Sequence, residues 1–149
     1  MCQILQASSS LLSTSLTLSK LDQPTNKKEN GYVIGELTEE LLNGKYRGWL
    51  CGHFYPEDSP FHRNDIEVCI KDLHEGFVEE AHHHLCSFEL LFILSGEVIY
   101  RINEDLVTLR KNSFYILNPC TPEHLFEVKK QARILCIRLP SVPNNKMMH

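Results

Sequence analysis

From residue 45 to residue 139, the sequence is a succession of short apolar segments separated by turn residues. In one of these segments, Ile66, Val68 and Ile70 alternate with polar or small residues, which is the period of a half-buried strand. Further strands are expected at residues 45–54, 76–85, 88–94, 97–102, 106–109, 113–117, 123–128 and 132–139. Many short strands at regular spacing predict an all-β sandwich or barrel.

The N-terminal part of the chain differs in composition from this strand-rich part. Residues 1–30 are rich in Ser, Leu and Thr, and we expect a tail or an arm that pairs with a sheet edge, ahead of a single barrel domain at residues 31–149. Serines interrupt the leucines and the first lysine is Lys20, which argues against a secretory signal. One short helix is expected near residues 38–43, with Thr38 as its N-terminal cap.

The composition excludes several classes of function. Charged residues make up 23% and hydrophobic residues 42% of the 149 residues, and the net charge is −4, an ordinary balance for a globular domain. No basic cluster stands out, so nucleic acid is not an expected partner. No apolar run approaches ~20 residues, so no membrane span is expected. Six cysteines without a Cys-x-x-Cys pair predict a cytoplasmic chain with free, mostly buried thiols.

Three histidines and one glutamate form a candidate metal site. They are His82, His84, Glu89 and His124. Side chains alternate along a strand, so His82 and His84 project from one face and His83 from the other. Glu89 can lie beside them if the chain turns or bulges at Cys86-Ser87, and His124 follows a proline-rich turn on a different strand. Such a set suits a divalent first-row transition metal such as Fe, Mn, Ni, Co or Zn.

Four other histidines are expected to be ordinary surface or core residues, because an isolated histidine is seldom a ligand. They are His53, His62, His74 and His149. Cys86 and Cys120 fall inside the two candidate regions. We expect them to be small buried apolar side chains, with a close approach to the metal as the alternative.

The spacing of the candidate ligands resembles the first sequence motif of the cupin family. That motif reads Gly, five residues, His-x-His, three or four residues, Glu, six residues, Gly, and this sequence matches every position. The matching residues are Gly76, His82, His84, Glu89 and Gly96. In the second cupin motif, Pro119 and His124 match. The departures, in place of two glycines and an asparagine, are Ser113, Thr121 and Val128.

The resemblance covers residues 45–140 and implies a double-stranded β-helix (jelly-roll) barrel with a bound metal. Residues 48–54 and 140–146 are further similar to small single-domain bacterial cupins, a group without a settled activity. Cupins are frequently dimers, and residues 88–94 are apolar on both strand faces. We therefore expect a homodimer, with the N-terminal segment as the alternative cover for the outer face.

Three functions follow from such a site. The first is a metal-dependent enzyme acting on a small polar molecule, either a dioxygenase or an isomerase or lyase. The second is a non-catalytic binder or sensor of a small metabolite, and the third is a structural or storage role with an incidental metal. Four protein ligands would leave about two positions open on a six-coordinate ion, which favours the enzyme.

Residues outside the ligand set are weaker candidates for acid–base chemistry or substrate binding. They are Glu67, Lys71, Tyr100, Arg101 and Tyr115. Glu67 and Lys71 share a strand face with Cys69, which is a polar pocket wall if that face points inward and a solvated surface if it points outward. An exposed strand arginine is common, although Arg101 could pair with a substrate carboxylate.

Overall fold

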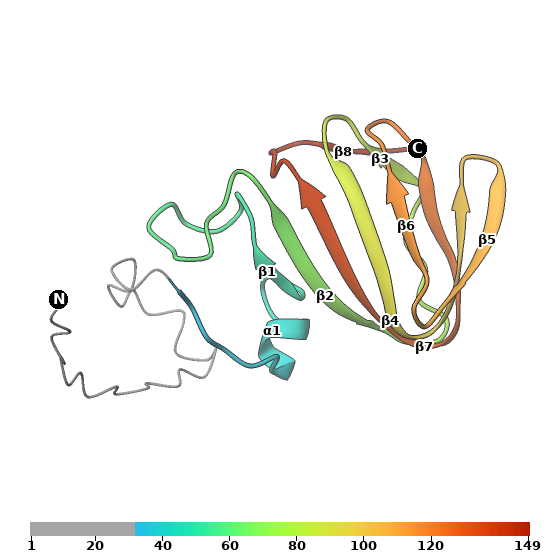
Figure 1. Ribbon diagram of the computed structural model, residues 1–149, viewed down its shortest axis with the longest axis horizontal. Coiled ribbons are helices and arrows are strands. Elements are labelled where there is room, and N and C mark those ends of the chain that lie inside the picture. The colour runs from blue at the N-terminus through green and yellow to red at the C-terminus, as the bar shows by residue number, and fades with distance from the viewer. Residues whose placement is uncertain (1–31) are drawn as a thin grey trace, which may run out of the picture.

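The described part of the protein is a curled β-structure with one short helix. The computed structural model describes residues 32–149, and the tail expected at residues 1–30 lies outside that range. The elements in chain order are α1 (Glu39–Asn43), β1 (Trp49–Cys51), β2 (Glu67–Leu73), β3 (His82–His84), β4 (Phe88–Ile102), β5 (Asp105–Arg110), β6 (Phe114–Leu117), β7 (Glu123–Leu139) and β8 (Lys146–Met148). Figure 1 shows the strands curling around one interior, which confirms the predicted all-β barrel.

Helix α1 lies where the sequence predicts a helix. The Thr38 hydroxyl accepts a hydrogen bond from the Leu41 N–H at 3.3 Å, and the Gly44 N–H donates to the Glu40 carbonyl at 2.8 Å. These contacts satisfy backbone groups that a short helix would otherwise leave free. With five residues, α1 is far too short to cross a membrane, and no described helix meets that requirement.

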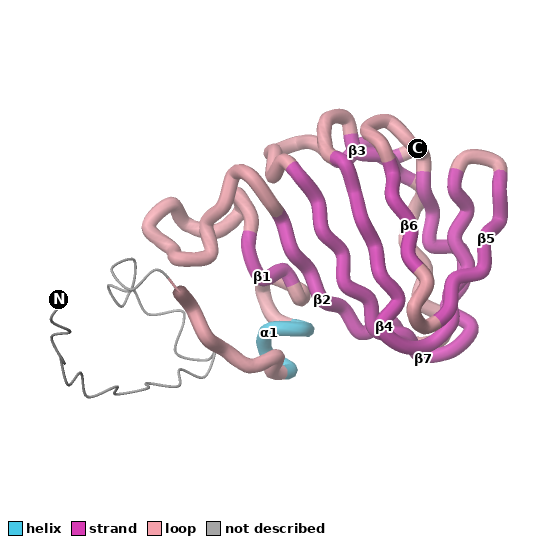
Figure 2. Tube along the Cα trace, viewed as in Figure 1, coloured by secondary structure: helices cyan, strands magenta, loops and turns pink. Residues whose placement is uncertain are grey.

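Two long, bent strands join the two sheets of the barrel. The first half of β4 pairs with the second half of β7, and the second half of β4 pairs with the first half of β7. One sheet therefore runs β1–β2–β7–β4–β6 (Figure 2), and the other runs β8–β3–β7–β4–β5. The bend in β4 lies at Gly96, where φ is +84° and a Cβ atom would stand 2.2 Å from the Gln131 carbonyl oxygen.

This bend corrects two sequence-based boundaries. The turn expected at Ser95-Gly96 is a bend within one continuous strand, and the strands expected at 123–128 and 132–139 are both parts of β7. Glycine permits the sharp change of direction because it tolerates positive φ and leaves room for the crossing strand. The pairing continues through the bend, so no connecting loop is needed.

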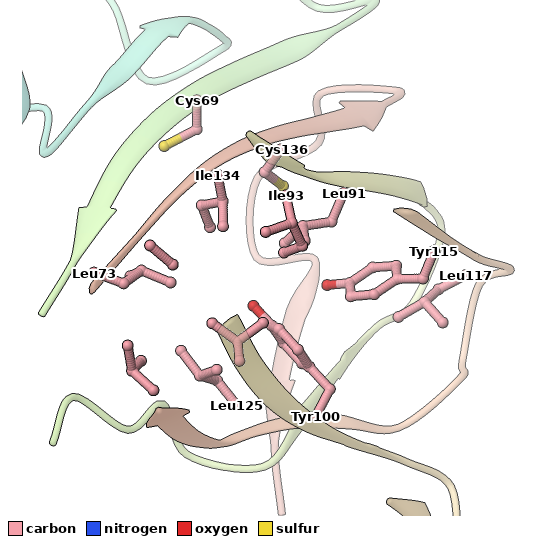
Figure 3. Close-up of a cluster of buried hydrophobic side chains, with 13 residues drawn as sticks. Cys69, Leu73, Leu91, Ile93, Tyr100, Tyr115, Leu117, Leu125, Ile134 and Cys136 are labelled. Atoms are coloured by element: carbon pink, nitrogen blue, oxygen red, sulfur yellow. The ribbon is translucent and has the colours of Figure 1, made fainter. Parts of the chain in front are cut away.

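The interior of the barrel combines an apolar core with a polar wall. Figure 3 shows the buried cluster, in which the Tyr100 and Tyr115 rings pack edge to face at 5.3 Å between their centroids. On β2, Glu67 and Cys69 are buried and face inward, whereas Val68 is only half-buried on the outer face. The apolar alternation that predicts β2 therefore marks the outside of the barrel, and the face shared by Glu67, Cys69 and Lys71 is the wall of a pocket.

Candidate metal centre

Strand β3 directs two imidazoles into the barrel. His82 is 4% exposed and His84 is 5% exposed, while His83 is half-buried on the opposite face. The rings of His82 and His84 stand nearly perpendicular, with centroids 5.3 Å apart. Outside the barrel, Nδ1 of His83 lies 2.8 Å from Nε2 of His149. The placement of these histidines follows the alternation read from the sequence.

Glu89 reaches the same interior because the chain breaks between β3 and β4. The Cys86 N–H donates to the Asn145 side chain at 2.7 Å, and the Ser87 hydroxyl donates to the Pro140 carbonyl at 2.6 Å. Beyond this break Glu89 is 4% exposed, and its Oε2 lies 3.3 Å from Nε2 of His84. Contacts from the C-terminal segment thus create the break that the position of Glu89 requires.

Glu123, rather than His124, joins the two histidines in the interior. Its Oε1 lies 3.2 Å from Nε2 of His82, and one ligand atom from each of His82, His84 and Glu123 lies within 4.8 Å of the others. The structure does not bring His124 into this group. Its ring packs against Phe126 on the other face of β7, opposite Arg101 of β4, whose guanidinium lies 5.3 Å from the Phe126 ring centre.

The turn before β7 explains why the neighbour of the expected residue faces inward. The left-handed residue of this turn is Cys120, with φ of +64°, one position before Thr121, which stands in place of a glycine of the second motif. The Cys120 N–H donates to the His84 carbonyl at 2.7 Å, which fixes the turn against β3. A shift of one residue exchanges the two faces of a strand. Leu125, which is 1% exposed, shares its strand face with Glu123.

Further hydrogen bonds orient the possible ligands. The Tyr115 hydroxyl lies 2.7 Å from Oε1 of Glu89 and 2.5 Å from Oε2 of Glu123. Nδ1 of His82 lies 2.9 Å from the Glu80 carbonyl oxygen, so this nitrogen carries a proton, and in the neutral imidazole Nε2 presents its lone pair to the interior. Glu123 is held in the same way, with Oε2 on Tyr115 and Oε1 directed toward His82.

The electrostatics of the cluster suit a divalent cation. Burial and the adjacent Glu89 raise the pKa of Glu123. Burial alone would also raise the pKa of Glu89, but contacts with His84, Arg138 and Tyr115 outweigh it and lower that pKa. Two buried carboxylates therefore share one phenolic proton, and each faces an imidazole nitrogen. A bound cation would relieve this repulsion, and two imidazoles with carboxylate oxygens are a donor set that transition metals favour.

The two histidines differ in their ease of protonation. Burial opposes the charge on His82, but hydrogen bonds to Glu123 and the Glu80 carbonyl outweigh it and raise the pKa of His82. Burial lowers the pKa of His84, and the charge of Arg138 adds to that effect. Nη1 of Arg138 lies 3.3 Å from Nε2 of His84. A neutral imidazole is the form that binds a metal, and Arg138 favours it at His84.

Arg138 is a site residue that was not predicted from the sequence. Its side chain is 15% exposed, and its Nε lies 3.3 Å from Glu67 Oε2 and 3.6 Å from Glu89 Oε2. The guanidinium carbon lies 4.2 Å from the Trp49 ring centre, within the range of a cation–π contact. It comes from β7, whose pairing with β2 and β4 places it between the two carboxylates.

The weaker sequence candidates divide between the inside and the outside of the barrel. Tyr100, Tyr115 and Lys71 line the pocket. Glu67 is buried beyond Arg138, where it also contacts Ser141 at 3.0 Å. Arg101 is exposed on the outer face of β4, as is common for a strand arginine.

The cysteines correct one expectation. Cys86 and Cys120 are exposed, not buried, because both lie in the turns at the end of the barrel. The cysteines that line the pocket are Cys69 and Cys136, which face each other across β2 and β7. Burial raises the pKa of the Cys69 thiol to about 12, so this thiol is not a nucleophile at neutral pH.

Comparison with known proteins identifies the architecture. No sequence family and no curated protein matches the chain. Among solved structures, a Klebsiella pneumoniae protein with a double-stranded β-helix domain is 19% identical, has a TM-score of 0.50 and covers 57% of this chain and 75% of its own. The chain has the cupin fold. At such identity the likeness shows the fold alone and leaves the activity of the chain to its own residues.

Two further cupins with similar structures are enzymes by name. Oxalate decarboxylase from Bacillus subtilis is 14% identical, with a TM-score of 0.51, and the match covers 57% of this chain and 24% of the enzyme. The DMSP lyase DddQ from Ruegeria pomeroyi is 15% identical, with a TM-score of 0.54, and the match covers 76% of this chain and 55% of the lyase. The cupin fold therefore accommodates catalysis on small molecules.

Proposed function

We propose that this cupin is a metal-dependent enzyme acting on a small molecule, with His82, His84 and Glu123 as the metal ligands. The observation that supports the proposal is the convergence of these three buried side chains on one point. Two histidines and one carboxylate with open positions are typical of non-haem Fe(II) oxygenases. This donor set favours the dioxygenase branch over an isomerase or lyase.

The surrounding residues have distinct tasks in this proposal. A bound Fe(II) ion would supply the oxygen-activating chemistry. Tyr115 stays protonated, because burial and then the adjacent Glu89 raise its pKa, so it serves as a hydrogen-bond donor and not as a base. Glu89, held by Tyr115 and His84, is available as a fourth ligand. At the pocket rim, Glu79 is paired with Lys146 at 2.6 Å and closes one side.

Nitric oxide tests the open-site assignment without knowledge of the substrate. Protein loaded anaerobically with Fe(II) should bind one iron per chain and give the high-spin iron–nitrosyl signal in electron paramagnetic resonance, because three protein ligands leave coordination positions free. His83→Ala, which changes only the outward-facing histidine, should give the same signal. Protein that binds no iron, or iron that binds no nitric oxide, would contradict the proposal. A tightly held metabolite recovered unchanged would instead indicate a binding protein.

We further propose a homodimer formed through the outer face of the β1–β2–β7–β4–β6 sheet. Two apolar rows cross four of its strands. The rows are Val68, Ile137, Leu90 and Ile116, and Ile70, Leu135, Phe92 and Phe114. Phe114 is 58% exposed and Ile116 50% exposed, and an apolar surface this continuous is rare on a monomer. We call this surface the outer apolar face.

A charge placed on the outer apolar face should separate the two copies. We expect Phe114→Glu to raise the dimer dissociation constant at least ~100-fold, because burying an unpaired carboxylate costs several kcal/mol. Sedimentation velocity over a range of concentrations measures the change. Leu106→Glu is the matched control, since Leu106 is 57% exposed on β5 in the other sheet. A wild-type chain that stays monomeric at all concentrations would refute the proposed dimer.

A further inference from the structure

The charges around the pocket define the class of ligand that the metal centre takes. We propose that this ligand is a small carboxylate-bearing anion and that Lys71 binds the carboxylate while a second oxygen of the ligand faces the metal. The inference rests on the proposed metal centre and adds the substrate class and a specificity residue to it.

Within the described residues, Lys71 is the pocket cation that has no ion pair. Arg138 faces Glu67 and Glu89, and Lys146 is bound to Glu79. Lys71 lines the same pocket, yet it forms no ion pair with any carboxylate in residues 32–149. Lys71 is half-buried, and an ammonium group without a carboxylate partner keeps most of its charge available for an anion.

The net charge of the site also favours a ligand with one negative charge. With Glu123 deprotonated, as a metal ligand must be, the site holds four carboxylates and three cations, which leaves one net negative charge before the metal is counted. The carboxylates are Glu67, Glu79, Glu89 and Glu123, and the cations are Lys71, Arg138 and Lys146. A divalent metal changes this balance to one net positive charge. A ligand with a single carboxylate then makes the site neutral, which a low-dielectric pocket favours.

Lys71 lines the same pocket as His82, His84 and Glu123, so one ligand in that pocket is adjacent to both. Lys71 lies on the inward face of β2, opposite Ile134 of β7, and both side chains line the pocket. Its Nζ stands 5.9 Å from the Trp49 ring centre, and Arg138 lies against the same ring at 4.2 Å. Both cations therefore lie near one indole ring, and Arg138 is the one that also contacts Glu89.

The size of the pocket limits the ligand. Its empty volume is ≈ 390 Å³, and because this figure includes space that is open to solvent, it is an upper bound on the room for a ligand. A short 2-hydroxy or 2-oxo acid satisfies both requirements, because its carboxylate and its adjacent oxygen can divide between Lys71 and the metal. A neutral polyol or sugar of the same size would leave Lys71 unpaired.

Glycolate and glycolamide are the probes for this proposal, because they differ by one charge at nearly the same shape. Calorimetric titration of metal-loaded protein should show glycolate binding more tightly than glycolamide. Lys71→Met should weaken glycolate binding at least ~10-fold, the value of a hydrogen bond to a charged group, and leave glycolamide binding unchanged. Lys111→Met, which removes an exposed lysine in the β5–β6 turn, should change neither affinity.

Metal content, measured on the same samples, separates this inference from the proposed function. A wild-type protein without metal would refute the metal centre itself. The role of Lys71 would be refuted if metal-loaded wild-type protein binds glycolate no better than glycolamide. It would also be refuted if the wild type and Lys71→Met bind glycolate equally well. Neither outcome would contradict the metal centre. Lys71→Gln, which keeps a polar side chain, serves as the second variant and should also lose the preference for the anion.

Discussion

Replacing Glu123 by alanine should weaken metal binding at least ~100-fold, whereas replacing its neighbour His124 should leave metal binding unchanged. Loss of a residue that only supports a ligand typically costs 10–100-fold in metal affinity, so loss of a ligand should cost more. Glu123 places Oε1 3.2 Å from His82 Nε2, and His124 packs against Phe126 outside the barrel. Elemental analysis after dialysis and competition with a chelator measure the two affinities.

Two further variants show whether any loss of metal is specific. His84→Ala should lose most of the metal, because His84 is buried at the same point, and His83→Ala should retain it, because His83 faces outward. Glu123→Gln keeps the shape of the side chain and should bind metal far more weakly than the wild type. If His124→Ala loses the metal and Glu123→Ala keeps it, the ligand set expected from the sequence is right and the assignment of Glu123 is wrong.

The first motif could be predicted from the sequence because its geometry is local. Two histidines separated by one residue share a strand face whatever the rest of the chain does, provided that the segment is a strand. The structure places His82 and His84 inward and His83 outward in that way. The direction of Glu89 could not be predicted locally. It depends on the break between β3 and β4, which is held by Asn145, more than fifty residues away in the chain.

The choice between Glu123 and His124 could not be made locally. It depends on which residue of the preceding turn adopts positive φ, and that residue is Cys120, an uncommon choice for this conformation. Leu125 and Phe126 are both apolar, so the alternation alone does not say which of them faces the core. The contact of Cys120 with β3 resolves the ambiguity.

The apolar pattern of β2 indicates the wrong face as the interior one, for a related reason. Apolar residues normally mark the buried face of a strand, but here Val68 and Ile70 belong to the outer apolar face. The polar residues of β2 face inward because a pocket, not a packed core, occupies that part of the barrel. On β2 the polar Glu67 and Lys71 therefore face the interior, and these two apolar residues face outward. This arrangement is expected for a strand that lines a pocket on one side and a dimer interface on the other.

Arg138 should be the residue whose loss most destabilises the metal-free protein. We expect Arg138→Met to lower the free energy of unfolding by about 3–5 kcal/mol, because it leaves two buried carboxylates without the guanidinium charge that they share. Those carboxylates are Glu67 and Glu89, which are 5% and 4% exposed. Urea unfolding in the presence of a chelator measures the effect without the contribution of bound metal.

An exposed arginine of the same strand is the control for Arg138. Arg133 forms a bidentate ion pair with Asp72, with both hydrogen bonds at 2.6 Å, but both side chains are more than a third exposed. Arg133→Met should therefore lower the free energy of unfolding by at most about 1 kcal/mol. Equal effects of the two substitutions would show that the pairing of Arg138 with its carboxylates contributes nothing beyond a surface ion pair.

The cost of Arg138→Met should also depend on pH. In the folded protein burial would raise the pKa of Glu89, but His84 and Arg138 outweigh it and lower that pKa. A lowered folded-state pKa gives stability that is complete above the unfolded pKa, about 4.3 for glutamate, and that is lost as the pH falls toward the folded value. The difference between wild type and variant should therefore be full at neutral pH and shrink below about pH 4. A difference that is constant from neutral to acidic pH would mean that Arg138 stabilises the fold through packing on Trp49 and not through its charge.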